Sequence, residues 1–404
     1  MNTDQINSKR TGIRIVSLSI LAVLILNFGL KLYRSPVDTY TWTELLINYA
    51  AGFIRRGMVG RIGYLVSPYI SVKFFLSALI CICYLIHLIL YARITRNIHI
   101  AEWLLFAFSP AAFLFPIYEF DAYGRKDVFL VLIFMVTFWL IMKKIRLRHL
   151  IPLVLILYQI GTLIHEYALF YFPFAILMIL ICYRDRPKKE LWLTLILSLA
   201  FLLANMVWLY ALSKRYYDLD LIPASWEGLI ENYDLTSQSG AFGWLGIPLK
   251  EGLQPVFDKL SYPQTFFSYL AGMLISAIPM LLLNARYRIV QSVYEIYQQR
   301  KGLLTVFALL LLSTMTIFIF SSDWGRLTYL YGFNLFLSLV VLKENLNLPE
   351  EAADALPLSA NQKIQWIALF ALFTGTWFLK MYVDGGHIAL QQGLIFKILD
   401  WISI

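Results

Sequence analysis

Ionisable side chains gather in three short stretches of the sequence, each between two apolar runs. Carboxylates and histidines can accept a proton from a reacting hydroxyl group, and arginines and lysines can bind anionic oxygen atoms. Each stretch mixes acidic and basic side chains, so each is a candidate for catalysis on a charged substrate. The residues are Asp121, Arg125, Lys126 and Asp127 in the first stretch, His165 and Glu166 in the second, and Asp323 and Arg326 in the third.

A fourth stretch combines two arginines with nearby glycines. Arg55 and Arg56 are followed by Gly57, Gly60 and Gly63. Glycine lets a backbone approach a ligand closely, and the planar guanidinium group matches phosphate oxygens with paired hydrogen bonds. This stretch is therefore a candidate phosphate site. The alternative is a helix at a membrane surface whose arginines extend to the aqueous side.

These residue types together fit one chemistry well, the displacement of a phosphate from the anomeric carbon of a sugar carried on a polyprenyl phosphate or diphosphate. A carboxylate or a histidine would accept the proton of the acceptor hydroxyl, and arginines would stabilise the charge on the departing phosphate. The alternative is that the stretches are ordinary loops. The candidate catalytic residues are Glu166, His165, Asp121, Asp127 and Asp323. The candidate phosphate-binding residues are Arg55, Arg56, Arg125, Lys126 and Arg326.

No motif in the sequence indicates a cofactor. The sequence has neither a Walker A loop nor a dinucleotide fingerprint, and no potential ligands have the fixed spacing of a metal site. We therefore expect no cofactor and no metal. The net charge of +9 would favour nucleic acid as the partner of a soluble protein. Here the charges lie between apolar runs, so we expect no nucleic-acid partner.

Long apolar runs separate the polar stretches. Hydrophobic residues make up 60% of the 404 residues and charged residues only 15%, whereas soluble domains have about 45–50% and about 25%. Such runs need lipid around them. The sequence predicts an all-α polytopic transmembrane bundle of about 11 helices that forms a single domain over residues 1–404. The predicted helices cover 13–33, 70–92, 102–118, 128–142, 150–164, 167–182, 190–212, 264–284, 302–320, 327–342 and 364–382.

Two of the predicted hairpins are short for a membrane crossing. Leu150–Cys182 must hold two crossings of about 16 residues each, which extend only about 24 Å across a core of about 30 Å. The turn with His165 and Glu166 should then lie below the membrane surface, and Trp103–Met142 behaves similarly. Ionisable groups at that depth must face protein or water. We therefore expect a recessed polar cavity that contains all three turns.

Lysine and arginine concentrate in alternate connections, such as 143–148 and 184–189. By the positive-inside rule these connections and the N-terminus are cytoplasmic. The outer face then carries a first loop at 34–69, with an interfacial helix near Trp42–Tyr49, and a large loop at 213–263. The polar final stretch, Ile388–Ile404, is predicted to lie as a helix on the outer interface.

The layout resembles the bacterial integral-membrane glycosyltransferases of the GT-C type and the O-antigen and exopolysaccharide polymerases of the Wzy type. Locally, Gly52–Gly57, Gly124–Asp127 and Asp323–Arg326 resemble segments of membrane proteins from polysaccharide loci. The resemblance implies an inner-membrane enzyme of surface-polysaccharide synthesis, with a polyprenyl-linked sugar or oligosaccharide as substrate. A chain-length regulator or another polysaccharide assembly protein is an implied partner. Many GT-C enzymes carry an acidic base in the first outer loop, where Asp38 and Glu44 are the only acids, without a matching motif.

Three other functions are compatible with parts of this pattern. A transporter or lipid-linked oligosaccharide flippase would also hold polar residues within the membrane, although such proteins often have internal repeats, which the sequence lacks. A membrane acyltransferase would use His165 as its base. A structural or sensing role would not require ionisable groups to gather on one side.

Overall fold

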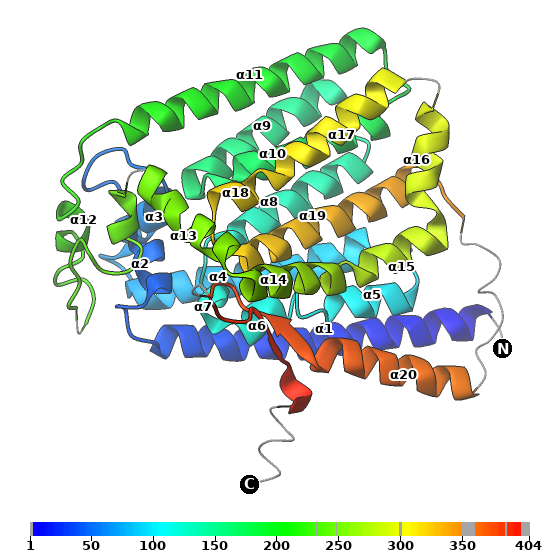
Figure 1. Cartoon of the computed structure of the whole chain (residues 1–404), viewed down its shortest axis with the longest axis horizontal. Coiled ribbons are helices and arrows are strands. Elements are labelled where there is room, and N and C mark those ends of the chain that lie inside the picture. Colours follow the sequence, from blue (N-terminus) through cyan, green and yellow to red (C-terminus); the bar gives the residue numbers. More distant parts are fainter. Residues whose placement is uncertain are drawn as a thin grey trace.

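The computed structural model is a bundle of α-helices with one two-stranded sheet (Figure 1). It describes residues 3–231, 233–247, 249–298, 301–349, 360–383 and 386–396. Within these residues, seven helices are long and apolar enough to cross a membrane, and three further apolar helices are shorter. The predicted all-α class is confirmed, and the apolar helices indicate a membrane protein.

The first half of the chain contains α1 (Thr3–Arg34), α2 (Tyr40–Leu46), α3 (Met58–Val66), α4 (Val72–Ile94), α5 (Ile100–Ala107), α6 (Phe115–Tyr118), α7 (Phe120–Tyr123), α8 (Asp127–Met142), α9 (Leu147–Ile164), α10 (Tyr167–Cys182) and α11 (Lys188–Ser213). The second half contains α12 (Leu221–Ala224), a 3-10 turn (Gly243–Leu245), α13 (Leu249–Ser261), α14 (Pro263–Ser276), α15 (Ile278–Tyr287), α16 (Ile289–Tyr297), α17 (Lys301–Met315), α18 (Ile317–Phe320), α19 (Trp324–Asn345), α20 (Ala360–Gly375), β1 (Trp377–Leu379) and β2 (Leu390–Gln392).

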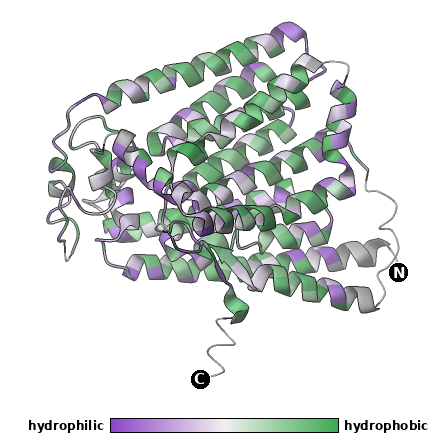
Figure 2. Ribbon diagram, viewed as in Figure 1, coloured by the Kyte–Doolittle hydropathy of each residue, from purple (hydrophilic) through white to green (hydrophobic). Residues whose placement is uncertain are grey.

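The centre of the bundle is formed by α8, α10 and α19, which contact one another. Of the apolar window in α19, 89% is buried, against 17% for α11 and for Gly302–Phe320. Most residues along the helices of the bundle are hydrophobic (Figure 2). A helix that is apolar all round needs either a core or lipid around it. The central helices therefore have protein around them, and α11 and α17 have surfaces suited to lipid.

The predicted helix over 102–118 is wrong. In its place α5 ends at Ala107, a turn carries Pro110, and the short helices α6 and α7 follow. Proline lacks an amide hydrogen, and its ring clashes with the preceding turn of a helix. The break leaves a re-oriented segment that leads directly into the polar stretch before α8. The predicted helix over 364–382 also ends early, since α20 stops at Gly375 and β1 follows.

The predicted interfacial helix over Ile388–Ile404 is wrong at its start, where β2 forms. Leu390 pairs with Leu379 and Gln392 pairs with Trp377 in an antiparallel hairpin. The backbone gains partners in β1 that a surface helix would not offer, and the amide of Gly393 donates to the carbonyl of Thr376. The part of the prediction that falls on 397–404 lies outside the described residues.

The two ends of the bundle differ in character. At one end, Arg14 donates to the carbonyls of Arg96 and Ile98, so the N-terminal helix meets the turn after α4. At the other end, the indole of Trp226 donates to the carbonyl of Leu46 at 2.8 Å, so the loop at 213–263 packs on the loop at 34–69. Figure 1 shows these two loops together at the left and the N-terminus at the right. We call the end of the bundle that carries these loops the loop end. We call the end that carries Arg14 and the turn after α4 the basic end.

Helix α2 is not the surface helix that the sequence predicted. Residues Thr41 to Leu46 are all buried. The large loop covers them, and α3 packs so closely that a Cβ at Gly60 would lie 2.2 Å from the carbonyl oxygen of Ile47. The exposed side of the first loop belongs instead to α3, on which Arg61, Ile62 and Leu65 face outward.

Candidate functional site

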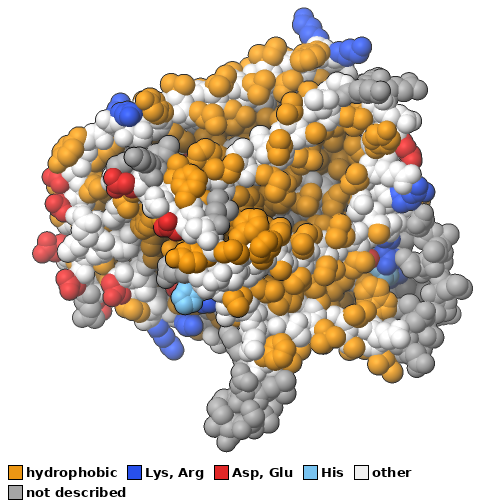
Figure 3. Space-filling model, in the orientation of Figure 1, with side chains coloured by type: hydrophobic (Ala, Val, Ile, Leu, Met, Phe, Trp, Pro, Cys, Tyr) orange, Lys and Arg blue, Asp and Glu red, His pale blue; other side chains and the backbone are white. Residues whose placement is uncertain are grey.

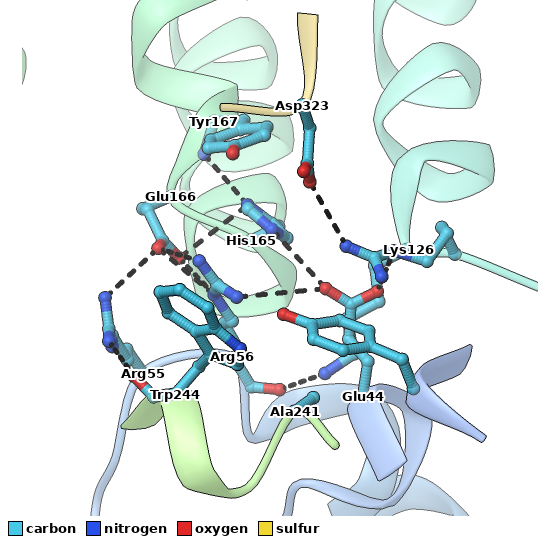
Figure 4. A network of polar contacts seen from close by, with 12 residues as sticks. Glu44, Arg55, Arg56, Lys126, His165, Glu166, Tyr167, Ala241, Trp244 and Asp323 are labelled. Carbon is cyan, nitrogen blue, oxygen red and sulfur yellow. Dashed lines mark hydrogen bonds and ion pairs between the residues drawn. The ribbon is translucent and has the colours of Figure 1, made fainter. Parts of the chain in front are cut away.

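The three polar turns come together at the loop end, as the sequence predicted (Figure 4). Arg326, at the start of α19, forms a buried ion pair with Asp127 at the start of α8. A second nitrogen of the same guanidinium group lies 3.1 Å from Nε2 of His165, in the turn between α9 and α10. Because only the fold brings these helix ends together, the cluster is a product of tertiary structure. We call it the ionic cluster: Glu44, Arg55, Arg56, Arg125, Lys126, Asp127, His165, Glu166, Asp323 and Arg326.

Glu44 lies at the centre of the ionic cluster and is fully buried. Its carboxylate is 2.8 Å from Nε of Arg125 and 3.6 Å from Nε2 of His165. Guanidinium nitrogens of Arg56 and Arg326 are 3.9 and 4.0 Å away. Burial alone would raise the pKa of Glu44, but the surrounding cations outweigh it and hold the pKa well below its ordinary value. Glu44 is therefore a carboxylate that organises the arginines around it.

Sequence reasoning did not place Glu44 in the site. The sequence identified Glu44 only as one of two acids in the first loop, within a helix that was expected at a surface. The position of α2 depends on the large loop, because the side chain of Asn48 donates to Ser225 at 2.8 Å. The amide of Ala241 also donates to Thr43 at 2.9 Å. The one available signal was the position of Glu44, a charged residue directly before the apolar run Leu45-Leu46-Ile47.

Arg55 and Arg56 both contact Glu166, so the fourth stretch joins the cluster as predicted. Nε of Arg56 donates to both carboxylate oxygens of Glu166, at 2.9 and 3.1 Å, and Nη2 donates a shorter hydrogen bond to one of them. Nη1 of Arg55 is 3.4 Å from the same carboxylate, and its Nη2 donates to the carbonyl of Trp244 at 3.0 Å. Arg56 has a φ of 64°, which is unusual for a residue other than glycine. Such a conformation costs about 1–3 kcal/mol and persists where surrounding contacts enforce it, often at functional sites.

Four members of the cluster have exposed side-chain surface. The exposed fractions are 35% for Arg55, 21% for Asp323, 16% for Glu166 and 13% for Arg56. The other members are at most 3% exposed. An entering ligand would meet two arginines and two carboxylates first. The charged side chains of the cluster pack tightly against one another. The recessed cavity expected from the sequence stays a prediction.

Asp121 does not join the cluster, although the sequence placed it among the catalytic candidates. Its side chain is exposed, and its backbone carbonyl accepts a hydrogen bond from Thr41 at 2.8 Å. The short helix α7 turns this residue away from Arg125 and Asp127, which point inward. Sequence spacing could not reveal this, because α7 forms only after the break at Pro110.

His165 is fully buried, and each of its ring nitrogens lies near both an N–H donor and a carboxylate. The amide of Tyr167 donates to Nδ1 at 3.2 Å, and Arg326 approaches Nε2. Burial, together with the charge of Arg56, lowers the pKa of His165 well below its ordinary value. The ring is therefore neutral near pH 7. It can accept a proton only if the surrounding cations move or are neutralised by a ligand.

Lys126 is also fully buried, and its ammonium group donates to the carbonyl of Arg56 at 2.5 Å. This contact fixes the backbone of Arg56. Burial lowers the pKa of Lys126 to about 7, against the attraction of Glu44. The sequence assigned Lys126 to phosphate binding, whereas its contact suits it to holding the Arg55–Arg56 stretch in place.

The titration of Lys126 should appear in the pH dependence of stability. The unfolded chain holds this proton up to about pH 10.4, whereas the folded chain releases it near pH 7. Between these values the unfolded state binds more protons, so stability should rise with pH in that window. Melting temperatures of the wild type and Lys126→Met, measured from pH 6 to 10, should diverge in favour of the wild type as pH rises. Parallel curves would show that Lys126 is not titrating in the folded protein.

Among the described residues, no group of three or more histidine, cysteine, aspartate or glutamate side chains is arranged to hold a metal ion. Each carboxylate of the cluster instead has an arginine beside it. The cluster contains four arginines and four carboxylates, and Lys126 adds a further positive charge below about pH 7, so the charge of the cluster suits an incoming anion. Comparison of the chain with protein-family models, curated proteins and solved structures gave no match.

Proposed function

We propose that the protein transfers sugars from a polyprenyl phosphate or diphosphate to an acceptor hydroxyl, as a glycosyltransferase or polymerase of bacterial surface polysaccharide. The observation that carries the proposal is the ionic cluster itself. It joins two partly exposed arginines and two partly exposed carboxylates at one end of an apolar bundle. A donor of this kind has an anionic phosphate attached to a lipid chain, so one molecule would match both the cluster and its surroundings.

In this proposal Arg55 and Arg56 bind the donor phosphate in place of Glu166. Guanidinium groups bind phosphate oxygens with two parallel hydrogen bonds, and Arg56 already binds a carboxylate in that way. The lipid chain stays between helices in the bilayer. As the bond between the anomeric carbon and the phosphate oxygen breaks, its electron pair goes to the phosphate, and the two arginines stabilise the resulting charge.

Asp323 is the proposed base. Its carboxylate is 21% exposed and accepts a hydrogen bond from Arg326 at 3.1 Å, which fixes its direction. The acceptor hydroxyl attacks the anomeric carbon while Asp323 takes its proton. The partly exposed carboxylate of Glu166 suits this role less well. Burial alone would raise its pKa, but Arg56 and the neighbouring cations outweigh burial and keep the pKa well below the ordinary value. Glu44 orients Arg125 and Arg326 without touching the substrate.

The proposal includes a topology with about eleven crossings of the bacterial inner membrane and the ionic cluster at the outer face. The seven long and three shorter apolar helices supply ten segments, and α5 to α7 together supply a broken eleventh. The N-terminus and the lysine- and arginine-rich connections lie at the basic end, which by the positive-inside rule is cytoplasmic. Lipid-linked sugars are polymerised on the outer face, where no nucleotide sugar is expected.

A deletion strain tests the proposed function on a gel of surface polysaccharide. Loss of a polymerase should leave chains with a single repeat unit, because units are still made and still cross the membrane. Loss of a flippase, the second candidate, should leave no chains at all. An unchanged ladder would contradict the proposal.

A further inference from the structure

A groove of about 690 Å³ lies at the basic end of the bundle, away from the ionic cluster. Its walls are formed by α10 and α11 on one side and by α16 and α17 on the other. Its size falls within the roughly 300–1,000 Å³ of small-molecule sites. Leu180, Leu195 and Val306 are among the side chains that form its walls. Arg184 and Lys188, from the connection between α10 and α11, lie at its edge. The groove therefore combines apolar walls with two positive charges.

The walls belong to the least buried helices of the bundle. Only 17% of the apolar window is buried in α11 and in Gly302–Phe320. Figure 3 shows a mostly hydrophobic surface over this part of the molecule, with lysine or arginine side chains at the upper right, where α11 begins. Water in such a groove would lack polar partners. The occupant that these walls favour is a hydrocarbon chain.

Three features place the charged edge at the depth of lipid headgroups. Arg184 and Lys188 are cations at the basic end, and Nε of Arg184 lies 3.8 Å from the carboxylate of the exposed Asp185. Lys188 begins α11, and the amide groups at a helix start favour anions. Trp192, one turn further on, lines the groove and is 59% exposed. Tryptophan is enriched at the interface between membrane and water.

We propose that this groove binds an anionic diacyl phospholipid, with the phosphate at Arg184 and Lys188 and an acyl chain along the apolar walls. Charge complementarity selects the anionic headgroup, and basic recesses between transmembrane helices bind such headgroups in membranes. The site lies at the basic end, away from the ionic cluster at the loop end. It is therefore a second lipid site, independent of the proposed sugar transfer.

Native mass spectrometry of the purified full chain tests the proposal, with phosphatidylglycerol and phosphatidylcholine titrated separately. The wild type should bind one phosphatidylglycerol at least about 10-fold more tightly than phosphatidylcholine. The double variant Arg184→Gln/Lys188→Gln should lose this preference. The matched control is Arg186→Gln/Lys189→Gln, which removes the same charge from exposed residues of the same connection. The control should change the affinity less than about twofold.

A third variant fills the groove without removing charge. A Cβ added at Gly302, which lines the groove, would meet no atom within 4 Å. Gly302→Phe should therefore fold normally and still lose tight phosphatidylglycerol binding. Equal losses in the two double variants would overturn the proposal, since they would indicate general attraction to a basic surface. Unchanged binding by Gly302→Phe would also overturn it, as would equal binding of the two phospholipids by the wild type.

Discussion

Replacing Glu44 with glutamine should destabilise the protein more than almost any other single substitution. The change keeps the shape of the side chain and removes the charge at the centre of the cluster. Arg125, Arg326 and Arg56 would then lose a shared counter-charge that is fully buried. Removing one member of a buried ion pair costs about 3–5 kcal/mol, because the remaining charge stays buried without compensation. Thermal melting of the purified protein in detergent measures the effect.

Asp121→Asn is the matched control for this substitution. Both changes convert an acid to its amide, but the side chain of Asp121 is exposed and outside the cluster. Its melting temperature should equal that of the wild type. If Glu44→Gln melted like Asp121→Asn, the ionic contacts around Glu44 would not be present in the folded protein.

Arg326→Lys should have a comparable effect, although the substitution preserves the charge. The guanidinium group of Arg326 reaches three partners with different nitrogens. Nε contacts Asp127, Nη1 contacts Asp323 at 3.1 Å and Nη2 lies 3.1 Å from His165. A single ammonium group cannot occupy these three positions, so Asp127 would be left as a buried carboxylate without its partner. The expected loss of stability is about 3 kcal/mol, measured by the same thermal melts.

Arg61→Lys provides the comparison for Arg326→Lys. Arg61 lies on the exposed side of α3, with its guanidinium group 5.5 Å from the ring centre of Tyr64. An exposed cation of this kind contributes little, so the variant should melt like the wild type. Equal melting temperatures for Arg326→Lys and the wild type would show that the three contacts of Arg326 do not form together.

The location of the site could be predicted because it follows from local features. Short hairpins and polar turns fix which ends of α8, α10 and α19 carry charge. Helices that cross the same layer in alternating directions bring those ends to one side. The contact between Arg326 and Asp323, at 3.1 Å and three residues apart, also follows from helical spacing alone.

The centre of the site could not be predicted because it depends on distant contacts. Glu44 reaches the arginines only because the large loop buries α2, and the hydrogen bond from Trp226 to the carbonyl of Leu46 joins residues 180 apart in sequence. Asp121 was misplaced for a related reason, since the break at Pro110 and the short α7 decide its direction. The helix over 102–118 was predicted from its apolar composition alone, and Pro110 was the available signal for the break.

The most direct measurement of the central claim is the polysaccharide ladder of the deletion strain when it carries site variants. Asp323→Asn removes the proposed base, which should slow transfer about 100-fold or more. We expect chains that stop at one repeat unit, with normal amounts of the protein in the membrane. Asp121→Asn should restore the full ladder. A full ladder from Asp323→Asn, expressed at the same level, would contradict the assignment of sugar transfer to the ionic cluster.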